Sequence, residues 1–318
     1  EMLTAMAFVA FGDHPADLAI IEVGLGGRFD STNVFADPAV SVITPVDYDH
    51  LEMLGPELSK IAWEKAGIIK AGRPVVVARQ MDEAREVILA EAEALGAPVL
   101  MMGQDYDAWE ERGRLMVQTP DRLLDLPAPS LQGSYQFANA GTAVMAALTW
   151  GHPAITEEVL AAGLTSTVWP ARFQRLTAGP LFAMAEAAGS DLWLDGGHNP
   201  HAGRALAESV RRLMARDGRP LALIVAMYAR KDALGFFQPF ADLNPRVITT
   251  GFESPTAALP EDLAAAARQA GLQASTAADV TEALARALSG GDAPHVLICG
   301  GLHFAGEVLA MSPDTWPT

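Results

Sequence analysis

The stretch Leu192-Trp-Leu-Asp-Gly-Gly-His-Asn-Pro-His201 decides the fold of the second half of the chain. Its first four residues are an apolar run that ends in a carboxylate, which is typical of a buried strand in a parallel sheet. Two glycines predict a turn, and Asn199-Pro200 predicts the start of a helix over residues 201–216. A strand, a loop and a helix in this order form the unit from which a sheet covered by helices on both faces is built.

The same alternation continues to the end of the chain. The apolar runs predict strands at residues 221–227, 246–250 and 295–299, and the 3.6-residue periodicity predicts helices at residues 233–242, 260–270, 281–288 and 304–311. Alternation at this spacing requires right-handed crossovers between parallel strands. We therefore expect the second half to be a Rossmann-like α/β domain.

The first half is less regular. We expect strands at residues 18–23, 40–45, 74–78 and 98–102, a hairpin near residues 114–118, and helices at the start of the chain and at residues 55–66, 82–95, 137–148 and 157–163. The joint falls near Trp169-Pro-Ala-Arg172, which predicts two domains, residues 1–168 and 169–318.

Composition excludes several classes of protein. Lys+Arg of 22 against Asp+Glu of 39 gives a net charge of −17, so we expect no general binding to nucleic acid or to an anionic membrane. The single cysteine, Cys299, excludes an internal disulfide framework and is expected to be a buried strand residue. No apolar run is long enough for a transmembrane helix and no signal-peptide pattern is present, so we expect a cytoplasmic protein.

The segment Glu22-Val-Gly-Leu-Gly-Gly-Arg-Phe-Asp-Ser-Thr-Asn33 follows the first predicted strand. It is not a dinucleotide fingerprint, because Phe29 stands where the third glycine is required. Glu22 at a strand end suits a hard cation such as Mg²⁺, and the alternative is a carboxylate that caps the glycine turn. His50, just past the next strand, would lie beside Glu22 in a metal or phosphate site; alone, it would be a surface or packing residue.

Lys65 lies in Trp63-Glu-Lys-Ala-Gly67, and the chain has only four lysines. Lysine can lose its proton when buried and arginine cannot, which favours a specific role for this position. The alternative is a solvated helix face on which Glu64 pairs with Lys60.

Three residues of the second half suit a nucleotide. Arg172 at the domain joint could reach a phosphate, or form an interdomain salt bridge instead. Asp195 at a strand end suits a ribose hydroxyl, and His198 at a helix N-terminus suits a terminal phosphate. The alternative is a plain Asn199-Pro200 helix cap with incidental histidines.

Together these segments resemble the dihydrofolate synthase/folylpolyglutamate synthase family, a branch of the Mur ligase superfamily. Six motifs occur in that family's order: Glu-x-Gly-Leu-Gly-Gly-Arg-x-Asp-x-Thr-Asn from Glu22, Asp-His at His50, Glu-Lys-Ala-Gly-Ile around Lys65, Tyr-Gln-x-x-Asn-Ala around Asn139, Pro-x-Arg-Phe-Gln around Arg172 and Asp-Gly-x-His-Asn-Pro-His from Asp195. The closing Ile298-Cys-Gly-Gly-Leu-His-Phe-Ala-Gly306 is also similar. The resemblance covers essentially the whole chain, with Ala171 and Gly197 as small departures.

The resemblance implies an ATP- and Mg²⁺-dependent amide ligase. A carboxylate of dihydropteroate or of a folate is phosphorylated, and L-glutamate attacks the acyl phosphate. The implied roles are Mg²⁺ ligands (Glu22, His50), a carbamylated lysine (Lys65), ATP contacts (Asn139, Arg172, Asp195, His198) and a pterin-substrate loop (Phe29, Asp30, Ser31). The implied protein is a cytoplasmic monomer.

The implied fold is a P-loop-type parallel-sheet ATPase domain followed by the Rossmann-like domain. The family's Gly-Lys-Ser phosphate loop precedes the Glu22 motif, and none of the four lysines here follows a glycine. We therefore expect the first domain to be truncated and the 318-residue chain alone to be inactive but able to bind ADP weakly. The alternatives are a cell-wall Mur ligase acting on a UDP-muramoyl peptide and a non-catalytic nucleotide-binding protein.

Overall fold

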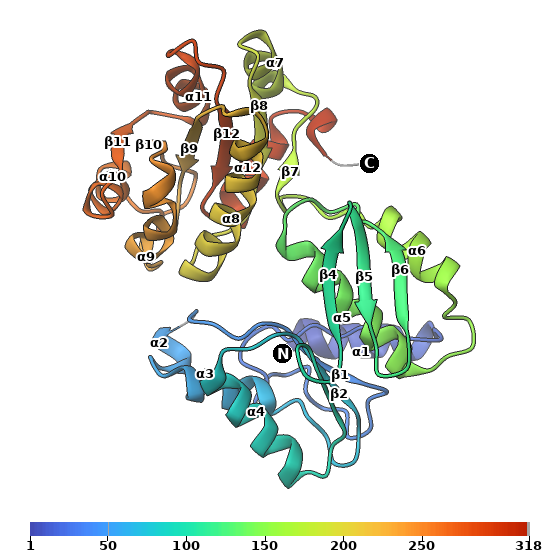
Figure 1. Ribbon diagram of the computed structural model, residues 1–318. Coiled ribbons are helices and arrows are strands. Elements are labelled where there is room, and N and C mark those ends of the chain that lie inside the picture. Colours follow the sequence, from blue (N-terminus) through green and yellow to red (C-terminus); the bar gives the residue numbers. More distant parts are fainter. Residues whose placement is uncertain (50, 317–318) are drawn as a thin grey trace. The chain divides into compact units, whose positions relative to one another are not determined.

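The structure, a computed structural model, describes residues 1–49 and 51–316 and contains two compact units (Figure 1). The first unit holds Glu1–Pro127 and Ala138–Ala162, and the second holds Ala128–Phe137 and Gly163–Thr318. The division at residues 168 and 169 stays a prediction; the compact units differ from it by placing Ala128–Phe137 and residues 163–168 in the second unit.

A three-stranded parallel sheet, in the order β1-β2-β3, forms the core of the first unit. Its strands are β1 (Ser41–Ile43), β2 (Val75–Val77) and β3 (Val99–Met101). The helices α3 (Leu58–Ala66) and α4 (Asp82–Ala94) pack against it through buried apolar residues such as Ile61 and Ile88. These strands and helices lie where the apolar pattern predicts them.

The rest of the first unit is antiparallel or helical. In place of the single predicted hairpin, an antiparallel sheet is formed by β4 (Asp107–Glu111), β5 (Arg114–Gln118) and β6 (Leu123–Pro127). The helices are α1 (Met2–Asp13), α2 (Leu51–Leu54), α5 (Tyr135–Trp150) and α6 (Glu157–Ser166). Helix α5 begins in the second unit and α6 ends in it. Helix α1 buries none of its residues.

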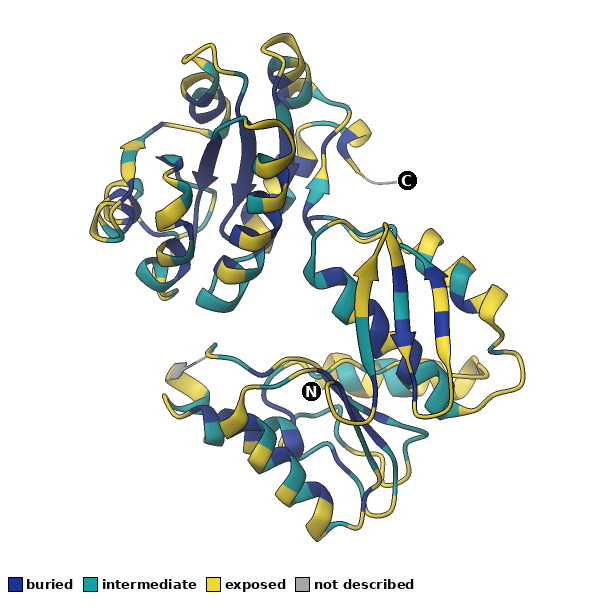
Figure 2. Ribbon diagram, viewed as in Figure 1, coloured by how far each residue is buried: buried dark blue, intermediate teal, exposed yellow. Residues whose placement is uncertain are grey.

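The second unit is built on a six-stranded sheet in the order β11-β10-β9-β12-β8-β7, parallel except for β7. The strands are β7 (Gln174–Arg175), β8 (Asp191–Leu194), β9 (Leu221–Val225), β10 (Arg246–Thr249), β11 (Gln273–Thr276) and β12 (His295–Cys299). Every residue of the central strands β9 and β12 is buried, as Figure 2 shows in dark blue. Burial on both faces explains why these strands read as continuous apolar runs.

Helices cover both faces of this sheet. One face carries α8 (Pro200–Asp217), α9 (Ala233–Phe237), the 3₁₀ turn η1 (Gln238–Leu243) and α10 (Pro260–Gln269), and the other carries α7 (Pro180–Ala187), α11 (Val280–Leu288) and α12 (Leu302–Ala310). A short 3₁₀ turn, η2 (Pro313–Thr315), follows α12. This doubly covered sheet confirms the α/β fold expected for the second half.

One predicted strand is wrong. Residues 18–23 form no strand, and Ile20 is 87% exposed. An apolar run becomes a buried strand only where a neighbouring strand satisfies its N–H and C=O groups. In the described residues, β1 pairs with β2 alone, so this run has no strand to pair with.

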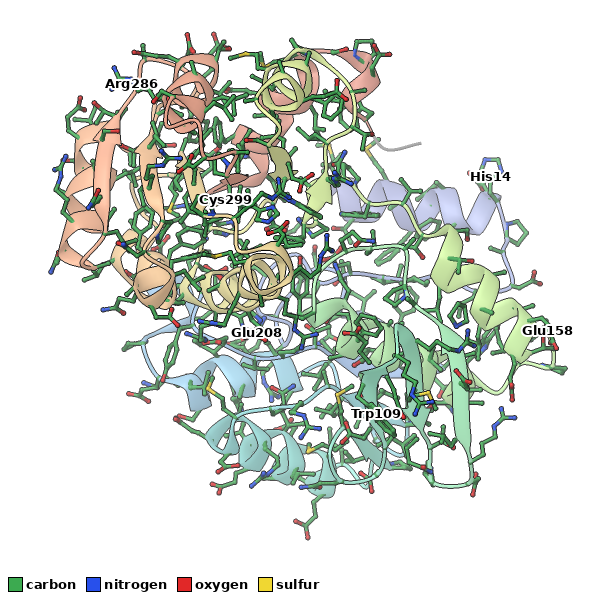
Figure 3. All side chains as sticks on the ribbon, turned by 45° about the horizontal axis from the view of Figure 1, so that its top comes forward. His14, Trp109, Glu158, Glu208, Arg286 and Cys299 are labelled. Atoms are coloured by element: carbon green, nitrogen blue, oxygen red, sulfur yellow. The ribbon has the colours of Figure 1, made fainter. Side chains whose placement is uncertain are left out.

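Cys299 lies at the end of β12 and is 1% exposed, as expected for a small buried strand residue. Figure 3 shows it among the side chains of the second unit, whereas Glu208 on α8 and Arg286 on α11 belong to charged pairs of the helix surfaces. Among the described residues, no helix is long and apolar enough to cross a membrane.

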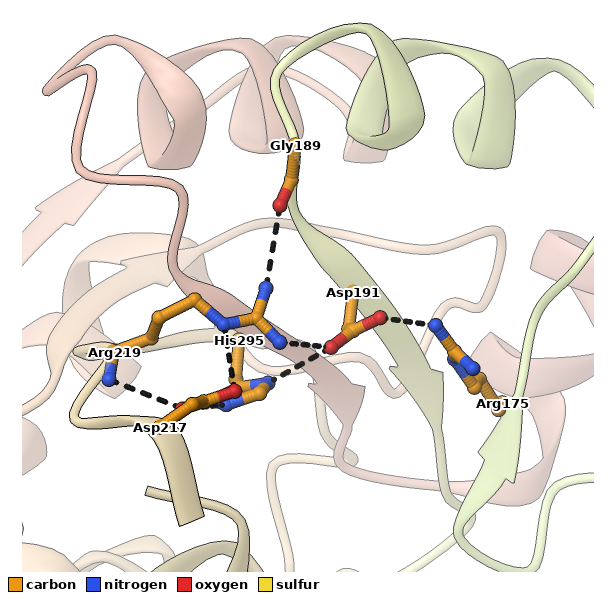
Figure 4. A network of polar contacts seen from close by, with 6 residues as sticks. All are labelled: Arg175, Gly189, Asp191, Asp217, Arg219 and His295. Atoms are coloured by element: carbon orange, nitrogen blue, oxygen red, sulfur yellow. Dashed lines mark hydrogen bonds and ion pairs between the residues drawn. The ribbon is translucent and has the colours of Figure 1, made fainter. Parts of the chain in front are cut away.

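An ionic network around the buried His295 joins β8 to its neighbours at the start of the strand (Figure 4). The Asp191 carboxylate accepts hydrogen bonds from the guanidinium groups of Arg175 and Arg219. The imidazole of His295 lies between two carboxylates, with Nε2 3.0 Å from Oδ1 of Asp217 and Nδ1 3.4 Å from Oδ2 of Asp191. Burial acts to raise the pKa of Asp191, but the two arginines outweigh it and hold that pKa below its usual value.

We expect Asp191→Asn to destabilise the second unit by about 1–3 kcal/mol at neutral pH, because the partly buried guanidinium of Arg219 and, more weakly, the exposed guanidinium of Arg175 lose their counter-charge. The wild-type contribution is present above the unfolded pKa of about 3.9 and is lost as the pH falls through the lowered folded pKa. Urea unfolding measures this at pH 7 and at pH 3: the difference in the free energy of unfolding between wild type and Asp191→Asn should be smaller at pH 3.

Asp82→Asn is the matched control, since Asp82 pairs with Arg85 on a surface where its side chain is 82% exposed. That change should cost less than about 1 kcal/mol. Equal losses from the two substitutions would contradict a special role for the Asp191 network.

Candidate functional site

The site of the second unit is centred on Asp195, the residue that follows β8. Its carboxylate is 5% exposed. Oδ1 accepts the main-chain N–H of Gly197 at 2.6 Å, and Oδ2 accepts the main-chain N–H of Phe173 at 2.7 Å and the hydroxyl of Tyr135 at 3.3 Å. Three donors thus fix the orientation of this carboxylate at the carboxyl end of the parallel sheet, where ligands bind in such folds.

The pKa values of this cluster are shifted. Burial raises the pKa of Asp195, although the two main-chain N–H groups and the charge of Arg172 oppose the shift. Burial and the nearby Asp195 charge also raise the pKa of Tyr135 well above its usual range. The tyrosine therefore keeps its proton and is the donor of the pair.

The chain before β7 carries strain where it approaches Asp195. Ala171 and Phe173 have φ angles of +54° and +48°, in the left-handed region that side chains other than glycine rarely adopt. Ala171 is held there by main-chain bonds: its carbonyl accepts the N–H of Gly196 at 2.9 Å, and its N–H donates to Oε1 of Gln174 at 3.0 Å. A glycine would adopt this conformation without strain, so Ala171 is the strained choice at this position.

Arg172 lies between these two strained residues. Its guanidinium donates from Nη1 to the Ala171 carbonyl at 3.2 Å, a contact inside the second unit. The alternative for Arg172 is an interdomain salt bridge. The contact with Ala171 holds the side chain without one.

Asn199 begins helix α8, as its position before a proline predicts. Its side chain accepts the N–H of Ala202 at 2.9 Å, and Pro200 occupies the first helical position. His198, just before the cap, has Nδ1 3.0 Å from the carbonyl oxygen of Gly196. Because a carbonyl only accepts, Nδ1 carries the proton, and a neutral ring has its lone pair on Nε2. Helix α8 has 18 residues, and its N-terminus lies beside Asp195, Arg172 and His198. The unpaired N–H groups and positive dipole of this helix end suit an anionic phosphate.

The glycine-rich loop belongs to the first unit and is closed by Asp30. Oδ2 of Asp30 accepts the N–H of Leu25 at 2.9 Å, and Oδ1 accepts the N–H and hydroxyl of Thr32 at 3.0 and 2.6 Å. Burial acts to raise the pKa of Asp30, but these hydrogen bonds outweigh it and hold the pKa below its usual value. The structure thus gives Asp30 a loop-closing role that is independent of any substrate.

The loop is seated on the last turn of α3. The N–H of Arg28 donates to the carbonyl of Glu64 at 2.8 Å, and its guanidinium lies 3.8 Å from the Trp63 ring centre and 2.9 Å from Glu91. Gly67 makes this seat possible, because a Cβ there would lie 2.3 Å from the Cβ of Arg28. Nothing in the sequence pattern revealed this pairing of two motifs.

Two further residues of the loop were expected to contact substrate. The Phe29 ring is 79% exposed and lies 6.2 Å from that of Trp63. The Ser31 hydroxyl lies 2.8 Å from that of Thr4 on α1. Their role with a substrate stays a prediction.

Lys65 lies in the last turn of α3 and is half-buried. Burial lowers its pKa, and the charge of Asp49 only partly opposes this shift. Lys60, which the exposed-face alternative pairs with Glu64, forms an ion pair with Glu57 at 3.1 Å.

The expected metal ligands are only partly described. Glu22 is an exposed carboxylate in an irregular segment, and His50 lies outside the described residues. Within the described part of the chain, no three His, Cys, Asp or Glu residues are gathered as a metal site. Glu22 could still serve a hard cation as one oxygen ligand, with phosphate and water as the others.

Asn139, the remaining candidate ATP contact, is an exposed residue of α5 in the first unit.

Gly67→Ala should loosen the glycine-rich loop, since the added methyl group displaces Arg28 from α3. We expect the amides of residues 25, 28 and 32 to exchange with deuterium about tenfold faster or more. Gly163→Ala is the control: it adds a methyl group where nothing lies within 4 Å, and should leave those amides unchanged. Unchanged exchange in the Gly67 variant would show that the loop is held by other contacts.

Comparisons with known proteins agree with this architecture. Residues 4–147 match the Mur ligase middle domain and residues 181–302 match the Mur ligase glutamate ligase domain. The chain is 31% identical to a folylpolyglutamate synthase of Lacticaseibacillus casei, over 97% of this chain and 70% of that protein. It spans 60% of the length of a dihydrofolate synthase/folylpolyglutamate synthase of Bacillus subtilis, at 33% identity over 83% of this chain.

Solved structures show the same fold. A Mycobacterium tuberculosis folylpolyglutamate synthase superposes with a TM-score of 0.83 at 30% identity, covering 97% of this chain and 71% of that one. A bifunctional enzyme of Yersinia pestis gives a TM-score of 0.81 at 29% identity, covering 96% and 69%. The expected two-domain α/β fold is confirmed, and the chain belongs to the folylpolyglutamate/dihydrofolate synthase family of Mur-type, ATP-dependent amide ligases.

Proposed function

We propose that the protein adds L-glutamate to dihydropteroate, to the glutamyl tail of folates, or to both, with ATP as co-substrate and Mg²⁺ as cofactor. The observation that carries the proposal is the fixed Asp195 carboxylate beside Arg172, His198 and the N-terminus of α8, in the unit that matches the glutamate ligase domain. Relatives have been solved with DHPP and ADP, and with Mn, AMPPNP and L-glutamate, which supports these ligand classes.

In the proposed reaction, a substrate carboxylate oxygen bonds to the terminal phosphorus of ATP, and the bond from that phosphorus to ADP breaks. The amino group of glutamate then attacks the acyl carbon, loses a proton, and expels phosphate. Both steps concentrate negative charge on the phosphoryl oxygens, which fixed cationic donors stabilise.

We assign these tasks to named residues. The Arg172 guanidinium and the N–H groups at the start of α8 would face phosphate, with His198 Nε2 beside them, and Asp195 would accept a ribose hydroxyl. Asn139 stays a candidate ATP contact. Mg²⁺, held in part by Glu22 and by His50, would neutralise phosphate charge. Phe29, Asp30 and Ser31 remain the candidates for the pterin side of the substrate.

The lowered pKa of Lys65 supports its proposed carbamylation. Only a neutral amine attacks CO₂, and burial increases the neutral fraction at a given pH. The product is an anion that can bind metal, a change that guanidinium cannot undergo.

The direct test, made with a full-length form that includes the family's phosphate loop, is ATP-dependent transfer of labelled L-glutamate to dihydropteroate and to a folate, with a UDP-muramoyl peptide as the rival acceptor. The Gly-Leu-Gly-Gly-Arg-Phe-Asp and Arg-Phe-Gln runs favour the folate acceptors. Transfer to the peptide alone would replace this proposal with a cell-wall ligase. No ATP turnover with any acceptor would favour a non-catalytic nucleotide-binding protein.

In the full-length form, Lys65→Arg should reduce turnover by about 10²-fold or more, because carbamylation is lost even though the positive charge is kept. Lys60→Arg is the control, since Lys60 lies on the exposed side of the same helix. Steady-state rates and mass spectrometry for a 44-Da adduct would be compared. Near-normal turnover of Lys65→Arg would contradict a role for carbamylated Lys65 in the reaction.

Asp195→Ala should weaken ADP binding about tenfold or more in titration calorimetry, because the proposed ribose hydroxyl loses a charged acceptor. Asp242→Ala, which removes an exposed partner of Arg211, is the control. Equal affinity of the two variants would place the nucleotide away from Asp195.

A further inference from the structure

We infer that Tyr135 is a positioning residue of the nucleotide site: its hydroxyl holds the Asp195 carboxylate so that a single oxygen, Oδ1, stays open to a ligand hydroxyl. This inference rests on the proposed function, which gives Asp195 a nucleotide to bind. Tyr135 was not among the residues expected to act, although it begins the Tyr-Gln-x-x-Asn-Ala motif.

The first argument is the number of acceptor positions on Asp195. A carboxylate oxygen accepts about two hydrogen bonds. Oδ2 already accepts the N–H of Phe173 at 2.7 Å and the hydroxyl of Tyr135 at 3.3 Å, so it is filled. Oδ1 accepts the N–H of Gly197 alone among the described contacts and keeps one position open. The tyrosine thereby decides which oxygen can receive a hydroxyl from the nucleotide.

The second argument is that the two residues before Tyr135 make room for its ring and attach the start of α5 to α8. Gly133 has φ of +109°, and a Cβ there would lie 2.8 Å from the Tyr135 ring. The N–H of Ser134 donates to Oγ of Ser209 on α8 at 3.3 Å, and that hydroxyl donates to the Ala205 carbonyl at 2.8 Å. The start of α5 is therefore attached to the helix that carries the phosphate-facing N-terminus.

The third argument concerns protonation. In the described part of the chain, the charged or titratable groups near this pair are Arg172 from the segment before β7, Cys299 from the end of β12 and His198 from the loop before α8. The Tyr135 hydrogen bond lowers the pKa of Asp195 against the opposing effect of burial. Its removal should raise that pKa further, so the carboxylate needed by the nucleotide would be lost at a higher pH during acidification.

The experiment measures ADP affinity by calorimetry across pH for the 318-residue chain and its Tyr135→Phe variant, which keeps the ring and removes the hydroxyl. We expect affinity about threefold to tenfold lower at pH 7.5, and an acidic loss of binding that begins at higher pH. Tyr106→Phe is the matched control, because it removes another buried tyrosine hydroxyl, bonded to the Val77 carbonyl at 3.1 Å in the first unit. That variant should match wild type in both respects.

A double-mutant cycle separates positioning from general damage. In an Asp195→Ala background, Tyr135→Phe should cause no further loss, because Tyr135 acts through Asp195. A further loss there, or a Tyr135→Phe variant with wild-type affinity and pH profile, would overturn the inference. If Asp195→Ala does not fold, the pH profile of Tyr135→Phe decides alone. Absence of ADP binding by wild type, or binding indifferent to Asp195→Ala, would instead overturn the proposed nucleotide site.

Discussion

A carboxylate buried at the end of a parallel strand is the constraint on which the second unit depends. Asp195 is hidden from water, and a buried charge is tolerated only when donors surround it. Two of those donors are main-chain N–H groups, of Phe173 and Gly197, so the backbone on both sides must be shaped around one side chain. The left-handed conformations of Ala171 and Phe173 are the local cost of bringing that segment close enough.

Strand β8 carries a carboxylate at each end, and the fold treats the two in opposite ways. Asp191, at the start, is surrounded by arginines that hold its pKa down, so it is an ionised structural anchor. Asp195, just past the end, has its pKa raised by burial and is satisfied mainly by neutral donors. The first arrangement stabilises the sheet; the second keeps acceptor capacity for a ligand. The difference in partners, not in residue type, separates stability from proposed function.

Local patterns predicted much of this architecture. The strands β8, β9, β10 and β12 are apolar runs that needed no knowledge of their neighbours, and Asn199-Pro200 announced α8 correctly. Elements with mixed patterns were not predicted. Strand β11 lies at the edge of the sheet and has exposed alternate residues, and α7 follows the domain joint. The strand predicted at residues 18–23 failed for a different reason, because periodicity shows that a segment could be buried but not that a partner strand lies beside it.

In the candidate site, the positions of the functional residues could be predicted from the sequence, but their partners could not. The positions of Asp195, His198 and Arg172 after strands or at the joint followed from spacing and motif. The partners of Asp195 did not, because Tyr135 and Phe173 are 60 and 22 residues away and only the folded chain brings them to one carboxylate. The packing of Arg28 against Gly67 could not be predicted either, because a sequence does not show which glycines avoid a steric clash.

The buried thiol of Cys299 has a practical consequence. It is the chain's one cysteine, it is 1% exposed, and burial and the nearby Asp195 charge raise its pKa, so the reactive thiolate is suppressed while β12 stays in the sheet. The native chain is therefore a silent background for site-specific labelling: a cysteine introduced on an exposed surface would take a fluorophore or spin label alone. The rate at which Cys299 itself reacts would then report how often the six-stranded sheet opens.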